Sequence, residues 1–174
     1  MEIVLKKGSI SEVSCISSLG KTTFDEAFGA LFRDRNDVLN YLEATFSITK
    51  ITASLKKENN HFWIAYADEV PVGYAKFKTH CPVENLSVNN TAQLQKIYIK
   101  KDFLSLKIGS RLLSVVLEEA KKEKMKFIWL SVLNSNIPAI NFYLKHQFYK
   151  KGMMTYTIGK ERFEFHTMLR NLDP

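Results

Sequence analysis

The segment covering residues 94–109 constrains the fold of this chain more than any other part of the sequence. It begins with strand-type residues (LQKIYI), continues through a short loop and reaches the start of an amphipathic helix at Ile108. The first N–H groups of such a helix have no intrahelical acceptor, and the helix dipole favours negative charge beside them. A strand–loop–helix unit of this kind therefore predicts an α/β fold, in which the turn is either an anion site at the helix start or an ordinary strand-to-helix connection.

The rest of the chain predicts a mixed arrangement of strands and helices. Ser9 and Glu12 fit a capping box before a first helix, and we expect Gly20 to end that helix. Asn36 is expected to cap a later helix, and Gly159-Lys160 to form the turn of a terminal hairpin. Strands are expected at residues 2–6, 61–67, 72–79, 92–99, 127–133, 148–158 and 162–169, and helices at residues 10–19, 24–32, 37–46, 48–58, 108–124 and 137–145.

Length and composition indicate one globular domain over residues 1–174. The chain is 45% hydrophobic and 25% charged, and it contains no apolar run of about 18 residues that would span a membrane. The N-terminus lacks the order of a signal peptide, so we expect a cytoplasmic protein in which Cys15 and Cys81 are free thiols. The spacing of histidines and cysteines predicts no metal site.

The net charge of +7 is concentrated in one part of the chain. Residues 96–126 contain nine Lys or Arg against four acidic residues. Such a segment is compatible with nucleic acid or with a single anionic ligand. Aromatic residues are not interleaved with the basic ones in the manner of a nucleic-acid platform, so nucleic acid is the disfavoured partner.

Three motifs resemble the GNAT family of N-acetyltransferases. The first is the strand LQKIYI followed by Asp102-Phe103, the second is the helix start IGSRLL from Ile108, and the third is Asn136-x-x-Ala-x-x-x-Tyr143. The family's loop pattern, Gln or Arg, two residues, Gly, one residue, Gly or Ala, falls on Leu104, Lys107 and Gly109. Only Gly109 matches, and Lys107 replaces the glycine with a charge. The resemblance covers about residues 2–172 and is strongest over residues 94–148.

The resemblance implies a GNAT fold, a mixed central sheet of about seven strands flanked by helices, and acetyl-CoA as cosubstrate. Tyr143 takes the position of the general acid that protonates the thiolate leaving group. Asn136 takes a position that either bonds the cosubstrate arm or only caps its helix. The residues implied in cosubstrate binding are Ile97, Tyr98, Ile99, Leu104, Lys107, Ile108, Gly109, Ser110 and Asn136.

The N-terminal aromatic residues resemble the branch typified by the PaiA polyamine acetyltransferases. That likeness implies a small amine as acceptor, with a polyamine among the candidates, and a substrate site that includes Phe24, Phe28, Tyr41 and Glu43. A polyamine needs carboxylates, and the N-terminal helices offer several without spacing that selects among them: Asp25, Glu26, Asp34, Asp37 and Glu43. Many family members carry, on the strand before the loop, a Glu that acts as the general base. This chain has Gln93 and Gln95 there.

Two alternatives to an enzyme remain open at the level of the sequence. The missing Glu and the missing loop glycine favour a non-catalytic GNAT-fold module that binds CoA or a regulatory partner. The basic segment leaves a nucleic-acid-binding protein as the less favoured of the two. A homodimer is also left open, and no membrane partner is expected.

Overall fold

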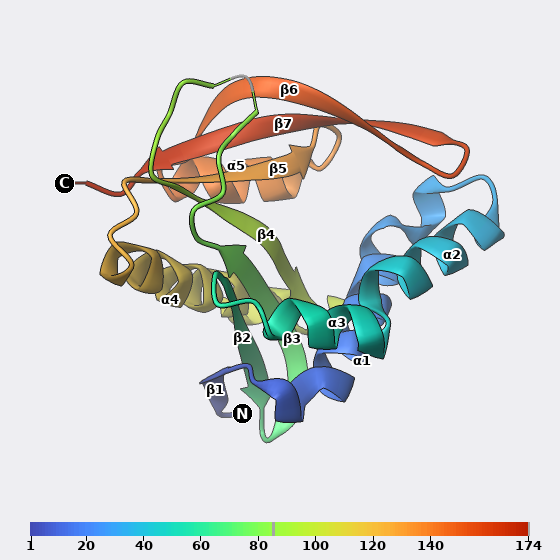
Figure 1. Cartoon of the computed structure of the whole chain (residues 1–174). Helices are drawn as coiled ribbons and strands as arrows, with labels where there is room; N and C mark the ends of the chain where they lie inside the picture. Colours follow the sequence, from blue (N-terminus) through green and yellow to red (C-terminus); the bar gives the residue numbers. More distant parts are fainter. Residues whose placement is uncertain (85, 174) are drawn as a thin grey trace.

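The computed structural model, which describes residues 1–84 and 86–173, contains one seven-stranded sheet in the order β1-β2-β3-β4-β5-β7-β6 (Figure 1). Neighbouring strands are antiparallel except for β4 and β5, which are parallel. The strands are β1 (Ile3–Lys7), β2 (Asn60–Ala67), β3 (Val70–Lys78), β4 (Thr91–Ile99), β5 (Phe127–Leu133), β6 (Tyr149–Ile158) and β7 (Glu161–Asn171). The α-helices are α1 (Val13–Phe28), α2 (Arg35–Phe46), α3 (Ile48–Leu55), α4 (Ile108–Lys122) and α5 (Ile137–Lys145), and the 3₁₀ helices are η1 (Ile10–Glu12), η2 (Gly29–Leu31) and η3 (Lys101–Leu106).

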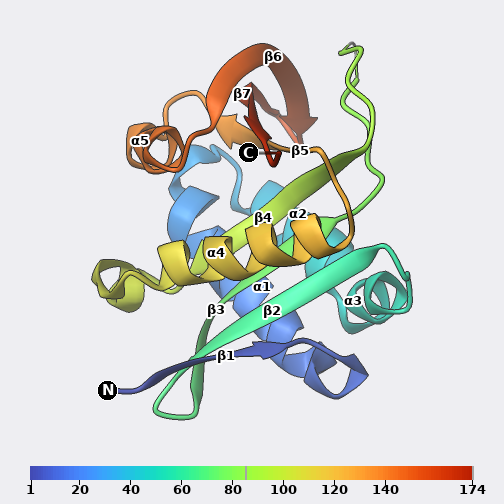
Figure 2. The ribbon, with the colours of Figure 1, turned by 90° about the vertical axis from the view of Figure 1, so that its left-hand side faces the viewer.

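Helices cover both faces of the sheet (Figure 2). We call the face of β2–β4 that packs under α4 the α4 face, and the face that packs under α1–α3 the α1 face. Leu94 of β4 belongs to the buried cluster of the α4 face, whereas Tyr98 packs on the cluster of the α1 face. Side chains alternate along a regular strand, so Leu94 and Tyr98 would otherwise point to the same face. A β-bulge around Gln95 shifts the register between them, and they point to opposite faces.

The parallel pairing of β4 and β5 is short. Only residues Thr91 to Gln93 of β4 pair with Phe127 to Trp129 of β5, and β5 then continues beside β7 alone. Beyond Gln93 the two strands separate, which leaves the gap between β4 and β5 that Figure 1 shows. Within the described residues, β4 is therefore paired only with β3 along its second half.

Two predicted helices of the N-terminal third form a single helix. Gly20 does not end the first helix as predicted but lies in the middle of α1, which continues to Phe28. A β-carbon at Gly20 would lie 2.8 and 2.9 Å from the Cε1 and Cγ atoms of Phe46. The glycine is thus used for close packing of α1 on Phe46, and tertiary packing overrides its tendency to stop a helix.

The predicted helix caps are confirmed in part. The Ser9 amide donates to Glu12 Oε2 at 2.8 Å, which completes the capping box, although this box caps η1 ahead of α1. Asp34, not Asn36, caps α2, and its Oδ1 accepts from the Asn36 amide at 2.9 Å. The terminal hairpin turns at Gly159-Lys160 as predicted. No helix in the described residues is both long and apolar enough to cross a membrane.

Candidate active site

The central feature of the site is the edge of β4 that faces the gap, which we call the free edge (residues 94–99). Its backbone N–H and C=O groups on the β5 side have no ladder partner among the described residues. Unpaired edge groups of this kind accept an extended ligand as an added strand. Ile97 and Ile99 pack on the α4 face, and Tyr98 between them points to the α1 face.

The loop after the free edge has the backbone conformation that a glycine would favour, although the residue there is Lys107. Lys107 adopts φ 56° and ψ 19°, the left-handed conformation that L-residues rarely take and glycine takes readily. Its side chain is exposed. Leu104 of η3 is also exposed, at 61%. The loss of the family glycine has therefore left the turn into α4 in place.

The first turn of α4 packs on α5. A β-carbon at Gly109 would lie 3.3 Å from Ile99 and 3.6 Å from Phe142, and Ser110 Oγ lies 3.3 Å from His146 Nε2. Ile108 is fully buried beneath this turn. The helix start is thereby held beside the end of the free edge, where its first amides are available to an anion.

The guanidinium of Arg111, in the first turn of α4, is bonded to β1. Its Nη2 donates to the carbonyl oxygen of Ile3 at 2.8 Å, although the residue as a whole is exposed. Lys107, the residue directly before the helix, is exposed as well.

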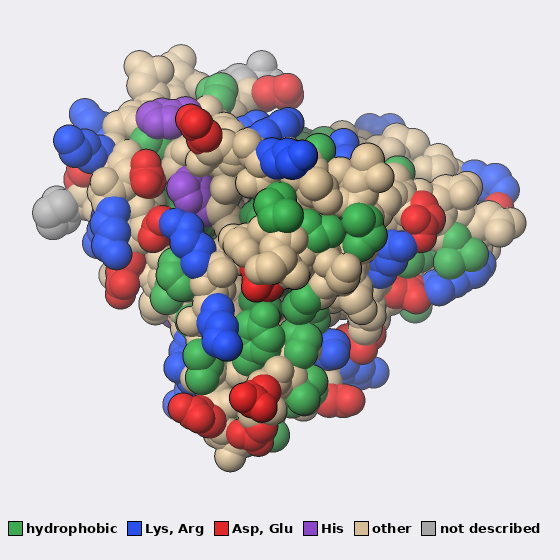
Figure 3. Space-filling model, turned by 60° about the horizontal axis from the view of Figure 1, so that its bottom comes forward, with side chains coloured by type: hydrophobic (Ala, Val, Ile, Leu, Met, Phe, Trp, Pro, Cys, Tyr) green, Lys and Arg blue, Asp and Glu red, His purple; other side chains and the backbone are tan. Residues whose placement is uncertain are grey.

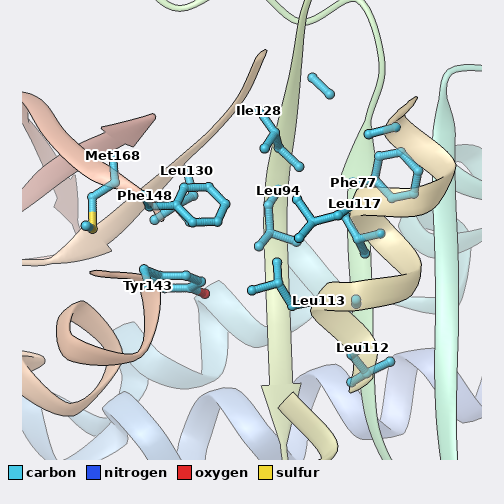
Figure 4. Close-up of a cluster of buried hydrophobic side chains, with 14 of the residues drawn as sticks. Phe77, Leu94, Leu112, Leu113, Leu117, Ile128, Leu130, Tyr143, Phe148 and Met168 are labelled. Atoms are coloured by element: carbon cyan, nitrogen blue, oxygen red, sulfur yellow. The ribbon is translucent and has the colours of Figure 1, made fainter. Parts of the chain in front are cut away.

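Tyr143 lies on the far side of the gap from β4 (Figure 4). It is 8% exposed and packs edge-on against Phe142 and Phe148, with ring centroids 5.2 and 5.6 Å away. Burial raises the pKa of its hydroxyl above the ordinary value, so the phenol stays protonated at neutral pH. At the start of the same helix Asn136 Oδ1 accepts from the Ala139 amide at 3.3 Å, which makes it an N-cap.

Aromatic side chains from the N-terminal helices gather on the other side of β4. The Phe24 ring lies 4.6 Å from Tyr41 and 5.0 Å from Phe28, and Phe28 lies 6.1 Å from Tyr98. Burial raises the pKa of Tyr98, and Tyr41 and Tyr143 raise it further. The Tyr98 ring also lies 6.0 Å from that of Tyr74, so Tyr98 is part of the aromatic cluster of the α1 face.

The carboxylates of the N-terminal helices are already engaged. The Arg35 guanidinium holds the pKa of Asp25 below its usual range, and Lys160 does the same for Asp34. Glu43 is exposed and paired with Lys21. The five pairings are Asp25 with Arg35, Glu26 with the Lys101 amide, Asp34 with Lys160, Asp37 with the Lys160 amide, and Glu43 with Lys21.

The β6–β7 hairpin reaches over to the segment between α1 and α2 (Figure 1). Phe163 packs on Phe32 at 5.2 Å, and Glu161 accepts from Arg33 Nε at 2.8 Å. Hollows flank this contact. One of ≈ 380 Å³ lies between α2, including Tyr41, and the hairpin, and one of ≈ 340 Å³ lies between Leu31, the end of β5 and β7. Neither is lined by the free edge.

Sequence reasoning missed two lysines of the α1 face, Lys76 and Lys96. Lys96 was counted only as part of the basic segment, and the bulge at Gln95 decides which face it points to. The two strand glutamines bond to one another, Gln95 Nε2 donating to Gln93 Oε1 at 3.0 Å. On the face shown in Figure 3, Lys and Arg side chains alternate with Asp and Glu and form no continuous basic surface.

Comparison with protein families identifies the chain. The model of the Acetyltransferase (GNAT) family matches residues 24–148. The chain belongs to this family of N-acetyltransferases, whose cosubstrate is acetyl-CoA. The resemblance predicted from the motifs and the fold predicted with it are both confirmed.

Relatives of known sequence or structure agree with this assignment. An uncharacterized N-acetyltransferase of Lactobacillus delbrueckii is 24% identical over 83% of each chain. A protein of Thermoplasma acidophilum named spermidine N(1)-acetyltransferase is 21% identical over 85% of this chain and 89% of its own. The crystal structure of the PaiA N-acetyltransferase from Thermoplasma acidophilum in complex with coenzyme A has a TM-score of 0.79 and 20% identity, covering 98% of this chain and 99% of the other. At this identity the likeness is one of fold.

Proposed function

From its membership of the GNAT family, we propose that this enzyme transfers the acetyl group of acetyl-CoA directly to a small primary amine in a ternary complex. The observation that carries the proposal is the free edge, which has Tyr143 on one side and the aromatic cluster of the α1 face on the other.

The proposed chemistry follows from these positions. The neutral amine attacks the thioester carbonyl, and backbone N–H groups near Ile97 to Ile99 stabilise the negative charge that develops on its oxygen. The carbon–sulfur bond then breaks, the nitrogen gives up a proton to water, and Tyr143 donates its proton to the departing thiolate, so that amide and thiol are formed. The α4 start, with Lys107 beside it, would hold the phosphates of the cosubstrate.

The base that keeps the acceptor amine neutral is not assigned to a side chain. Gln93 and Gln95 cannot take a proton, and Glu43 is exposed beside Lys21. Deprotonation through water fits these observations best, because an amine with an ordinary pKa of about 10.4 still has a small neutral fraction at neutral pH.

A polyamine is the finer hypothesis, suggested by the relative named spermidine N(1)-acetyltransferase. A polycation requires carboxylates that are free to bind it. All five carboxylates that the sequence offers on α1 and α2 are bonded to Lys, Arg or a backbone amide. A polyamine therefore belongs in the test panel but is not the acceptor that the charges favour.

Two measurements test the proposed function. Calorimetry with acetyl-CoA should show binding at one site per chain, and a thiol-release assay should show CoA formation that depends on an added amine. Binding without amine-dependent release would favour the non-catalytic CoA-binding module. If neither is observed, the chain is a GNAT scaffold that has lost its donor site. DNA binding should be absent at low salt, since a protein that binds phosphates non-specifically binds most tightly there.

A further inference from the structure

Four side chains, two from β3 and two from β4, form a patch on the α1 face. Tyr74 is paired with Tyr98, and Lys76 is paired with Lys96. The Lys96 ammonium lies 5.0 Å from the ring centroid of Phe46, which is fully buried. The Lys76 ammonium lies 5.6 Å from the ring of Phe62, which is 1% exposed. Both charges therefore lie deep among aromatic rings, although each lysine as a whole is half-buried.

Neither lysine has a counter-charge. Within the described residues, the salt bridges and hydrogen bonds involve neither the Lys76 nor the Lys96 ammonium. The other charges that act on Lys76 are all positive, from Lys96, Lys78, Lys57 and Lys50. Burial, aided by these lysines, lowers the pKa of Lys76 to about 8, and burial alone lowers the pKa of Lys96 to about 8.

Lysine is rarely buried without a partner, because removing an ammonium group from water is costly. Contact with aromatic rings offsets part of this desolvation but not the repulsion between two adjacent cations. A bound anion would offset both. With pKa values of about 8, both lysines are still mainly charged at neutral pH and able to bind one.

Tyr74 is the neutral hydrogen-bond donor of the patch. Tyr74 is 1% exposed, and its hydroxyl has no partner within the described residues. Burial raises its pKa well above the ordinary value, and Tyr98 and Tyr41 raise it further, so the hydroxyl keeps its proton. Ammonium and hydroxyl groups together match the acceptor oxygens of a carboxylate.

The position of Lys96 separates this patch from the phosphate site. Lys96 follows the bulge at Gln95, close to where β4 leaves β5, and its side chain lies on the α1 face. The α4 start lies beyond the opposite end of the free edge, after Ile99 and η3. An anion at Lys96 would therefore reach the site from the acceptor side of β4 and not as part of the cosubstrate.

We propose that Lys96, with Lys76 beside it, binds a carboxylate of the acceptor, so that the preferred substrate is an amino acid or similar amine carrying an anionic group. The inference rests on the proposed function, since it concerns the acceptor of the acetyl group. It extends that function from a small amine in general to an anionic one, and it opposes a polyamine.

The experiment compares amines that differ only at the end remote from the reacting nitrogen. 4-Aminobutyrate, 4-aminobutanamide and 1,4-diaminobutane present a carboxylate, a neutral amide and a second ammonium at the same chain position. We expect the wild-type kcat/KM for the carboxylate to exceed that for the amide at least tenfold, with the diamine lowest. Calorimetry with 4-aminobutyrate in the presence of CoA measures acceptor binding even if turnover is slow.

Variants identify the residue responsible. Lys96→Met retains the length of the side chain without its charge, and we expect it to lower kcat/KM for 4-aminobutyrate at least tenfold while that for the amide stays within twofold. Lys96→Arg should restore part of the preference. Lys121→Met, at an exposed position near the end of α4, is the matched control and should change nothing.

The outcomes separate the two proposals. If no amine is acetylated and acetyl-CoA does not bind, the proposed function fails. If the amide or the diamine is the better substrate, or if Lys96→Met lowers turnover of all three amines equally, acetyl transfer stands and the carboxylate site is wrong. If turnover is absent but CoA binds, the calorimetric affinity for 4-aminobutyrate and its loss in Lys96→Met decide the inference alone.

Discussion

The free edge of β4 offers backbone groups to a ligand, whereas the α1 face of the same strand offers side chains. At the free edge and the α4 start, the groups available to a ligand are backbone N–H and C=O groups, held in place by Ile97, Ile99 and Gly109. On the α1 face, the groups available are side chains: aromatic rings, Tyr74 and the pair Lys76 and Lys96. In the proposed complex, one strand thus presents backbone groups to acetyl-CoA and side chains to the acceptor.

The difference explains why the two regions tolerate substitution differently. A backbone site survives changes of side chain as long as the conformation is kept, and Lys107 keeps the left-handed turn that the family glycine would make. A side-chain site changes its ligand when its residues change. The exchange of a family Glu for Gln93 or Gln95 and the presence of Lys96 therefore bear on the acceptor more than on acetyl-CoA.

The largest effect is expected at Tyr143, which lies across the gap from the free edge and is the one side chain to which we assign chemistry. Tyr143→Phe should lower turnover by ~10²-fold or more with little change in acetyl-CoA affinity, because the phenol is needed only when the thiolate leaves. Steady-state kinetics and calorimetry check this. Tyr149→Phe, at an exposed position of β6, is the matched control. Unchanged turnover would remove Tyr143 from the mechanism.

A substitution in α1 should disturb the α1 face and spare the free edge. Gly20→Ala forces its β-carbon against the Phe46 ring, so we expect the free energy of unfolding to fall by about 1–3 kcal/mol despite the better helix propensity of alanine. Because Lys96 rests on Phe46, the KM for the amine should rise more than the KM for acetyl-CoA. Gly152→Ala, where a β-carbon meets nothing within 4 Å, should change stability by less than about 0.5 kcal/mol. Equal changes in both KM values would argue against separate regions.

The α4 face should show a dependence of stability on pH. Burial lowers the pKa of His61 below 6.5, and Lys7 lowers it further, while Glu119 and Glu123 act in the opposite direction. Because the unfolded state binds the proton more readily, the contribution of neutral His61 is fully present above pH ~6.5. This contribution to the free energy of unfolding is lost as the pH falls through the pKa of His61 in the folded protein. The loss is no more than ~1.4 kcal/mol per pH unit.

Urea unfolding between pH 5 and 7 measures this slope, because Lys76 and Lys96, with pKa values of about 8, titrate above that range. His61→Phe, which keeps the stacking on Phe77 at 4.6 Å, should flatten it. His146, whose pKa burial also lowers, would account for the slope that remains. An unchanged slope in His61→Phe would show that the dependence arises elsewhere.

The smallest effect is expected at Lys107. Lys107→Gly relieves the left-handed backbone and should raise the free energy of unfolding by about 0.5–1 kcal/mol, part of the gain being lost to the greater freedom of glycine when unfolded. Lys107→Asn removes the charge and tolerates the same conformation. Both variants should weaken acetyl-CoA binding by no more than ~5-fold, since an exposed charge contributes up to ~1 kcal/mol. Tighter binding by Lys107→Gly would mean that the lysine obstructs the phosphates.

Local sequence signals predicted most of the elements and failed where a distant contact decided the outcome. The strand at LQKIYI, the helix from Ile108 and the cap at Asn136 depend on neighbours in the chain, and they were predicted correctly. Gly20 was read as a helix stop, but its role is set by Phe46, which is far away in sequence. Glu43 was grouped with the substrate residues, but the position of α2 turns it toward Lys21.

The sequence by itself determined the family, the mixed α/β fold and the cosubstrate, because these depend on short motifs whose backbone conformation is set locally. Only the tertiary structure decided the arrangement of side chains from which we propose the acceptor site. The bulge at Gln95 selects the face on which Lys96 lies, and the packing of β3 beside β4 brings Lys76 next to it. Neither the pairing of these lysines nor the engagement of the N-terminal carboxylates can be read from spacing along the chain, because each joins residues that only folding brings together.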